Sequence, residues 1–351
     1  MRERANELLV AGCWLLVPRP REQRTTTSEQ PLASLPIAAI TLLTIYGVAT
    51  ARETCGDLLY FWGPKAHRFF SAAKIDVEFL KFPHYYLMHP DYPPLQPLVY
   101  AWSSIVTHEF SYWGATLLTP LYLLATVLAF RGFAAEKIRH ANAYATLLAA
   151  LLAFGFASGR AAGGADPQLV MFEVIALSAL TFADAHVIAT IALAGAAFTK
   201  VEGAAFAAVV IVAYAVVRRD LRRAVILTAP AAILVGSWIV FAKHHGFLDS
   251  YARGASSLHV ENLRLILYVT GFEASYRALY IPWIVSLAPL TFGRNWRRAM
   301  LPLVVACSAI LYTIFFYLHE PDAVWWIKAS AERVLLTPLA ALVVASAAAS
   351  E

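Results

Sequence analysis

The chain has 351 residues, of which 60% are hydrophobic and 15% are charged. An ordinary water-soluble domain has about a quarter of its residues charged, so this composition excludes that class. The formal net charge is +5, and no basic run is interleaved with aromatic residues, so the charge does not support nucleic-acid binding. The three cysteines are too widely spaced for a metal site or a disulfide framework.

The apolar residues fall into blocks of roughly 17 to 22, long enough to cross ~30 Å of hydrocarbon as helices. A transmembrane β-barrel would instead alternate over segments of about ten residues. The sequence therefore predicts an all-α, polytopic membrane protein with about 10 transmembrane helices. The expected spans are 33–51, 112–131, 141–158, 168–184, 186–200, 203–217, 224–243, 275–293, 299–318 and 334–350.

We expect two parts of unequal size. Residues 1–32 form a cytoplasmic N-terminal segment, in which the short apolar stretch 8–17 lies on the membrane surface. Residues 33–351 form a single transmembrane domain. Its outer loop, 52–111, carries the candidate catalytic acid and two helices that lie on the membrane surface.

Clusters of Lys and Arg set the predicted orientation, since such residues collect on cytoplasmic loops. An inside N-terminus places four clusters on the cytoplasmic side and leaves 52–111, 244–274 and 319–333 outside. The apolar stretch 93–108 is taken as a surface helix, because a span there would move every later cluster across the membrane. The clusters are Arg19, Arg21 and Arg24; Arg131, Lys137 and Arg139; Arg218, Arg219, Arg222 and Arg223; and Arg294, Arg297 and Arg298.

Asp57 follows the first span and precedes an aromatic stretch that contains Tyr60, Phe61 and Trp62. One interpretation is that Asp57 caps the N-terminus of the next helix. The other is that it has a functional role, since acids held near hydrocarbon are costly and are more often functional than structural.

Two more polar motifs are predicted on the same face. In the first, prolines surround His89, Asp91 and Tyr92, which makes either a plain turn or a rigid loop at the mouth of a cavity. In the second, Asp166 follows a glycine pair and precedes Pro167, so it either caps the next helix or faces the same cavity.

Lys200, Glu202 and Arg333 complete the polar set on the predicted outer face. Residues two apart do not face each other on a helix, so Lys200 and Glu202 are expected to point into a polar cavity rather than to pair. Arg333 is well suited to bind a phosphate oxyanion.

This set of groups suits the transfer of a sugar from a lipid-linked donor. Such a reaction needs a carboxylate to deprotonate the acceptor hydroxyl and cations to stabilise the phosphate leaving group. Asp57 is the candidate base, and Lys65, Lys200 and Arg333 are the candidate cations. Asp166 is expected to position the acceptor or to help hold a divalent metal.

The ordered motifs resemble those of the GT-C superfamily of polyprenyl-phosphate-dependent membrane glycosyltransferases, especially its bacterial members. The resemblance covers residues 33–340. The matching segments are Gly56-Asp57, Trp62-x-x-Lys65-Ala66, Asp91-Tyr92-Pro93-x-Leu95-x-Pro97, Gly164-Ala165-Asp166-Pro167, Lys200-x-Glu202-Gly203 and Arg333-x-Leu335-Leu336-x-Pro338.

The resemblance implies a GT-C fold and an inverting hexosyl or pentosyl transfer. The donor would be a polyprenyl-phosphate sugar, used at the periplasmic face of the bacterial inner membrane. Asp57 would be the base and Asp166 an assisting acid. Many relatives carry two adjacent acids in the first loop, whereas Leu58 follows Asp57 here.

The acceptor (a glycan, a lipid or a protein) and the metal requirement stay open. The main alternative is a transporter or flippase of lipid-linked glycans. That alternative predicts charges deep within the spans and broken helices near the midplane. The predicted spans are largely free of internal charge apart from Glu173.

Overall fold

The computed structural model describes residues 30–50, 55–82, 88–156, 161–247, 258–276, 280–291, 293–320 and 322–350. The surface stretch expected at 8–17 lies outside the described residues. The chain divides into two compact units, 1–36 and 37–351. The core and the site described below belong to the second unit.

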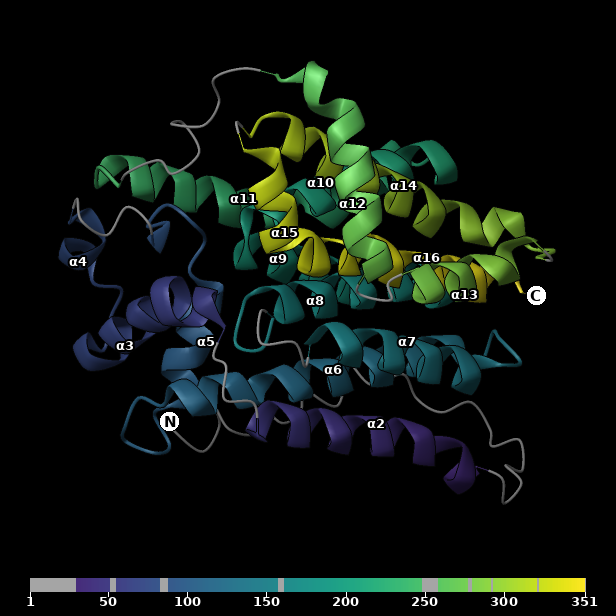
Figure 1. The fold of residues 1–351 in the computed structure, drawn as a ribbon, viewed down its shortest axis with the longest axis horizontal. Coiled ribbons are helices and arrows are strands. Elements are labelled where there is room, and N and C mark those ends of the chain that lie inside the picture. Colours follow the sequence, from purple (N-terminus) through teal and green to yellow (C-terminus); the bar gives the residue numbers. More distant parts are fainter. Residues whose placement is uncertain are drawn as a thin grey trace. The chain divides into compact units, whose positions relative to one another are not determined.

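The described part of the chain is built from helices (Figure 1). Two of them, η1 and η3, are short π-helical turns, and η4 is a 3-10 turn. The elements are α2 (Gln30–Thr50), η1 (Leu58–Trp62), α3 (Gly63–Ala72), α4 (Val77–Lys81), α5 (Leu95–Ser103), α6 (Tyr112–Ala134), α7 (Ala141–Phe156), α8 (Asp166–Ser178), η3 (Ala179–Ala183), α9 (His186–Thr199), α10 (Val201–Arg218), α11 (Leu221–His244), η4 (Val260–Asn262), α12 (Leu263–Tyr276), α13 (Tyr280–Thr291), α14 (Trp296–Leu318), α15 (Ala323–Val334) and α16 (Leu336–Ala349).

Six helical stretches of the described residues are long and apolar enough to cross a membrane, and three shorter apolar helices accompany them. Every predicted span coincides with an apolar helix, which confirms the all-α polytopic fold. The span expected at 275–293 is shorter than predicted, because α13 covers only Tyr280–Thr291. The six stretches are Tyr112–Ala134, Asp166–Ala183, Val201–Arg218, Leu221–His244, Trp296–Leu318 and Ala323–Ala349.

Two of the expected outer segments contain helices that the sequence pattern did not predict. α12 begins within 244–274 and α15 begins within 319–333, and the two pack together through Ile266, Ile327 and Ala331. Only Leu335 separates α15 from α16. This connection carries the end of α15, including Arg333, into the helix bundle.

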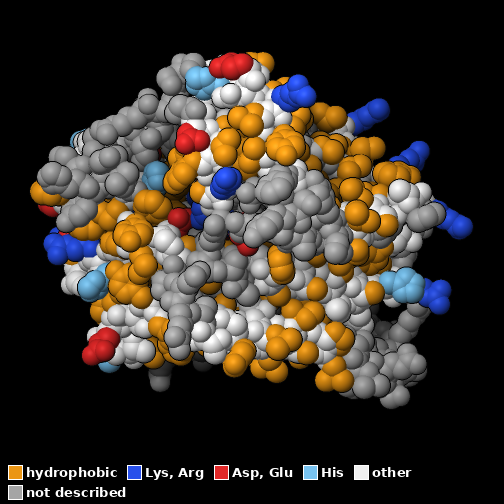
Figure 2. Space-filling view, in the orientation of Figure 1, with side chains coloured by type: hydrophobic (Ala, Val, Ile, Leu, Met, Phe, Trp, Pro, Cys, Tyr) orange, Lys and Arg blue, Asp and Glu red, His pale blue; other side chains and the backbone are white. Residues whose placement is uncertain are grey.

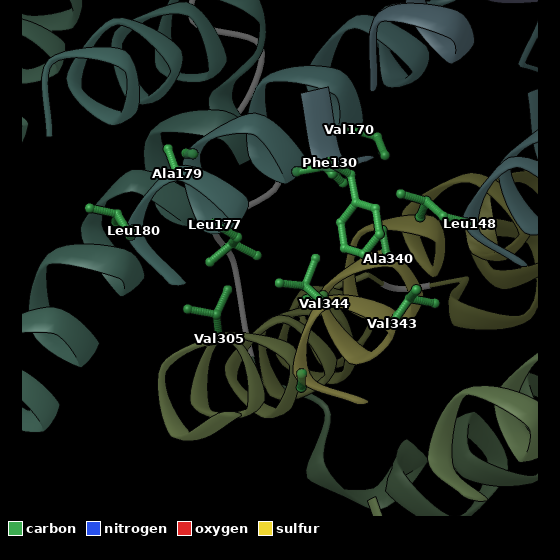
Figure 3. Close-up of a cluster of buried hydrophobic side chains, with 14 of the residues drawn as sticks. Phe130, Leu148, Val170, Leu177, Ala179, Leu180, Val305, Ala340, Val343 and Val344 are labelled. Atoms are coloured by element: carbon green, nitrogen blue, oxygen red, sulfur yellow. The ribbon is translucent and has the colours of Figure 1, made fainter. Parts of the chain in front are cut away.

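α16 is the most deeply buried helix of the core. Its residues are small and apolar, with alanine most frequent, and nearly all of them are buried. Small residues let helices approach closely within a membrane. Ala340, Val343 and Val344 meet Phe130 of α6 and Leu177 of α8 in this core (Figure 3).

The helices found in the expected outer loop, 52–111, are too short to span a membrane. α5 has 9 residues, which at 1.5 Å per residue covers roughly half of the hydrocarbon thickness. α5 packs against α3 and α6. The prediction that 93–108 is not a span is therefore confirmed.

Within the second unit, α3, α4 and α5 lie at the opposite end from two of the helix connections that carry Lys and Arg residues. The three helices lie on the left in Figure 1, whereas the α6–α7 connection and the C-terminal end lie on the right. Arg294 also lies at that right-hand end, because its backbone N–H donates to Ala349 O at 2.8 Å. Several Lys and Arg side chains project from the same edge in Figure 2. Two of the predicted cytoplasmic clusters thus lie opposite the first-loop helices.

Candidate functional site

A cavity of about 1020 Å³ opens between η1, α8, α10, α14, α15 and α16. Its walls are largely apolar but include a cluster of charged groups. Most of the predicted site residues line it: Asp57, His89, Tyr92, Asp166, Lys200, Glu202 and Arg333. Among the described residues, Lys65 and Asp91 are predicted site residues that do not line its wall.

Asp57 precedes the π-helical turn η1 and makes no side-chain capping hydrogen bond. Its Oδ2 instead accepts a hydrogen bond from Nη1 of Arg333, in a partly buried ion pair. Helix capping therefore does not account for the position of Asp57, whereas its ion pair with Arg333 on the cavity wall does.

Asp166 begins α8 after a tightly held glycine turn. Gly163 has φ +82, a conformation that favours glycine. Tyr100 Oη donates to Gly163 O at 2.6 Å, and Gly163 N–H donates to Thr119 Oγ1 at 3.0 Å. This anchoring fixes the start of α8 and points the Asp166 carboxylate at Lys200 (Nζ–Oδ1 3.1 Å) and Arg333 (Nη1–Oδ2 3.3 Å).

Lys200 is the single extended residue between α9 and α10, with φ −157 and ψ 158. The chain turns closely here, since a Cβ on Gly203 would lie 1.9 Å from Ala196 O. Lys200 Nζ also contacts Glu202 Oε1 at 3.0 Å. The expectation that Lys200 and Glu202 do not pair is wrong, because helical spacing does not apply to an extended residue at a helix junction.

These contacts form one chain of alternating charge: Glu202, Lys200, Asp166, Arg333 and Asp57. The cluster has one more carboxylate than cations. Charges taken from water need such partners, because the desolvation of each ion costs several kcal/mol. Nε of Arg333 and Nε1 of Trp62 are buried and have no hydrogen-bond partner among the described residues. Both residues line the cavity, so each retains a donor for a ligand.

The His89 loop forms an aromatic rim on the cavity. The His89 and Tyr92 rings lie 4.5 Å apart, and Trp62 lies 5.8 Å from Tyr92. Burial, together with the charges of Lys65 and Lys200, lowers the pKa of His89 to about 4. The imidazole is therefore neutral near pH 7 and suits a stacking surface better than a charged contact.

Lys65 holds this loop through a hydrogen bond to the backbone of His89. Its side chain is only 2% exposed, and its Nζ donates to His89 O at 3.1 Å and lies 4.5 Å from the centre of the Trp62 ring. Burial lowers the pKa of Lys65 to about 7, opposed by the charge of Asp91. Asp91 O accepts a hydrogen bond from Trp238 Nε1 at 2.7 Å, which ties the loop to α11. The geometry gives Lys65 and Asp91 supporting positions rather than a place on the cavity wall.

Glu173 and Thr337 are among the polar residues of the cavity wall that had no predicted role. Thr337 Oγ1 of α16 donates to Glu173 Oε2 of α8 at 2.7 Å. The available signal was the charge of Glu173 inside a predicted span, seven residues after Asp166 on the same helix.

No group of three or more His, Cys, Asp or Glu side chains is arranged to hold a metal ion in the described ranges. Asp166, which the sequence suggested as a possible metal ligand, contacts Nη1 of Arg333, as does Asp57. The metal requirement stays a prediction.

Comparison with known proteins bears on the fold alone. No family model and no curated protein sequence matches the chain. The chain is similar to the crystal structure of ArnT from Cupriavidus metallidurans bound to undecaprenyl phosphate, with a TM-score of 0.64 and 15% sequence identity. The chain shares the fold of this ArnT structure. The similarity covers 92% of this chain and 60% of the ArnT chain, so the chain spans less than two thirds of the length of that structure.

Proposed function

We propose that the protein is a membrane glycosyltransferase. It moves a hexosyl or pentosyl group from a polyprenyl-phosphate donor to an acceptor hydroxyl, with inversion at the anomeric carbon. The observation that carries this proposal is the charge cluster on the cavity wall, in which Asp57, Asp166, Lys200 and Arg333 contact one another although they come from four separate segments. The structurally similar ArnT chain binds undecaprenyl phosphate, which is consistent with a lipid-phosphate donor.

The donor phosphate binds at Arg333 and Lys200, the two cations of the cluster. Its negative charge competes with Asp57 for the Arg333 guanidinium, whose Nε also remains available. Partial release of Asp57 from that ion pair restores its ability to accept a proton. Donor binding in this way prepares the base.

Asp57 then accepts the proton of the acceptor hydroxyl as the hydroxyl oxygen attacks the anomeric carbon. The bond between the anomeric carbon and the phosphate oxygen breaks, and its electron pair stays on the phosphate. Arg333 and Lys200 stabilise the charge that develops on this leaving group. Asp166 contacts both cations and holds them in position.

The active site faces the outside of the bacterial inner membrane in this proposal. The support is the separation of the first-loop helices from the α6–α7 and C-terminal ends, where basic residues are found.

The test uses purified protein in proteoliposomes and a panel of undecaprenyl-phosphate sugars with a labelled sugar. A bacterial envelope extract supplies acceptors. We expect label in a new product together with free undecaprenyl phosphate. Passage of intact donor across the bilayer without cleavage would instead support the flippase alternative and refute the enzyme.

A further inference from the structure

A second polar group lies on the cavity wall, two helical turns along α8 from the charge cluster. It consists of Glu173 and Thr337, which are joined by a 2.7 Å hydrogen bond and both line the cavity wall. Glu173 is only 3% exposed and lies inside the candidate span Asp166–Ala183. An ionisable group within a span is costly and marks a functional site by default.

A purely structural role would be to join α8 to α16. Polar side chains do link helices in membranes, but a hydroxyl pair would do so without a carboxyl group. The hydrogen bond from Thr337 engages Oε2 of Glu173, and Glu173 also lines the cavity. A link between two helices needs only that one hydrogen bond, so it does not by itself account for a carboxyl group on the cavity wall.

The register of the helices relates this polar group to the charge cluster. Glu173 follows Asp166 by seven residues on α8, which is two turns along one helix face, or roughly 10 Å. Thr337 follows Arg333 by four residues across the α15–α16 junction. Leu169 and Val170 of α8 also line the cavity in this interval. A group bound at the charge cluster can thus extend toward Glu173 along one continuous wall.

We propose that Glu173 and Thr337 recognise a hydroxyl or amino group on the sugar of the donor. This inference rests on the proposed function and names a specificity site within it. A polyprenyl chain has no hydrogen-bonding group that would offset a buried carboxyl, and the proposed function assigns the donor phosphate to Arg333 and Lys200 in the charge cluster. The acceptor must reach Asp57, which shares Arg333 with Asp166 at the other end of this wall.

Three variants test the site. Thr337→Val keeps the shape of the side chain and removes its hydroxyl, and Glu173→Gln keeps the size and removes the acid. Ser178→Ala is the control, because Ser178 is a buried polar residue at the end of the same helix and lies outside the cavity lining. The measurements are kcat/KM for undecaprenyl-phosphate sugars that differ at single hydroxyl or amino positions, and the affinity for undecaprenyl phosphate without a sugar.

We expect Glu173→Gln and Thr337→Val to lower kcat/KM for the preferred donor by about tenfold or more, the size of a lost hydrogen bond to a charged or polar partner. Donors that lack the recognised group should lose little, so discrimination falls. Affinity for undecaprenyl phosphate and the behaviour of Ser178→Ala should match the wild type. An equal loss for every donor, or an unchanged preference, would overturn the inference while wild-type transfer still upholds the proposed function.

Discussion

Arg333 and Asp57 form an ion pair although 276 residues separate them in the chain. The contact joins two parts of the cavity wall, the start of η1 and the end of α15. It also pairs the candidate base, Asp57, with a guanidinium for which an incoming phosphate can compete. Loss of either member should therefore affect chemistry and donor binding in different ways.

Asp57→Asn should abolish base catalysis and leave donor binding intact. We expect kcat to fall by about 10²–10⁴, the range for a lost general base. Asparagine is a weaker partner for Arg333 than a carboxylate, so affinity for undecaprenyl phosphate should equal or exceed that of the wild type. Turnover assays and binding titrations on reconstituted protein measure the two effects separately.

Asp76→Asn is the matched control. Asp76 lies in the same outer loop, pairs with Arg68 at 2.6 Å and caps α4, and asparagine caps helices equally well. Near-normal turnover in Asp57→Asn, or an equal loss in both variants, would contradict the assignment of Asp57 as the base.

Arg333→Lys should weaken both donor binding and transfer. Lysine keeps the positive charge but offers one nitrogen, whereas the guanidinium can hold the carboxylates through Nη1 and still offer Nε. Removal of one such stabilising donor costs about 10²–10³ in kcat. Arg264→Lys on α12, an exposed position, should leave KM and kcat unchanged, and equal kinetics for the two variants would argue against a phosphate site at Arg333.

The helical part of the fold was largely predictable because apolar blocks of span length have few other solutions in a membrane. α12 and α15 were missed for a physical reason. α15 carries Trp325, Trp326 and Lys328, which are typical of the membrane interface, so the pattern indicated a polar outer segment. α12 has only 14 residues, too few to be recognised as a span. The structure buries one face of α15 against α12, which the composition of either segment alone does not indicate.

The site was predictable as a set of residues and not as a set of contacts. Motif order and charge topology selected Asp57, Asp166, Lys200 and Arg333, and all four line the cavity. The contact between Lys200 and Glu202 depends on one extended residue at a helix junction, which helical spacing does not anticipate. Lys65 matched a motif and was expected to bind substrate, yet it contacts the backbone of His89 and does not line the cavity.

Lys65→Met should change how thermal stability depends on pH. The pKa of Lys65 is lowered to about 7 in the fold from 10.5, so the unfolded chain binds more protons between these values. The wild type therefore gains stability as pH rises from about 7 toward 10.5, whereas methionine has no such dependence. In detergent, Tm of Lys65→Met minus Tm of wild type should fall as pH rises over this window. A difference that stays constant with pH would contradict the lowered pKa.

Gly203→Ala should disturb the Lys200 junction. A Cβ at position 203 would lie 1.9 Å from Ala196 O and 2.4 Å from Ala196 C, so the backbone of α9 or α10 must move. Overpacking of this kind costs about 1–3 kcal/mol. The shift also displaces Lys200 and Glu202, and a misplacement of about 1 Å at a catalytic group lowers turnover by about 10²-fold.

Gly236→Ala on α11 is the control for this change. A Cβ there has open space within 4 Å, and alanine favours a helix over glycine by up to about 1 kcal/mol. We expect its Tm to equal or exceed that of the wild type, with kcat unchanged. Both variants are measured by thermal unfolding in detergent and by transfer assay. Wild-type turnover in Gly203→Ala would mean that the close approach of α9 and α10 does not position Lys200.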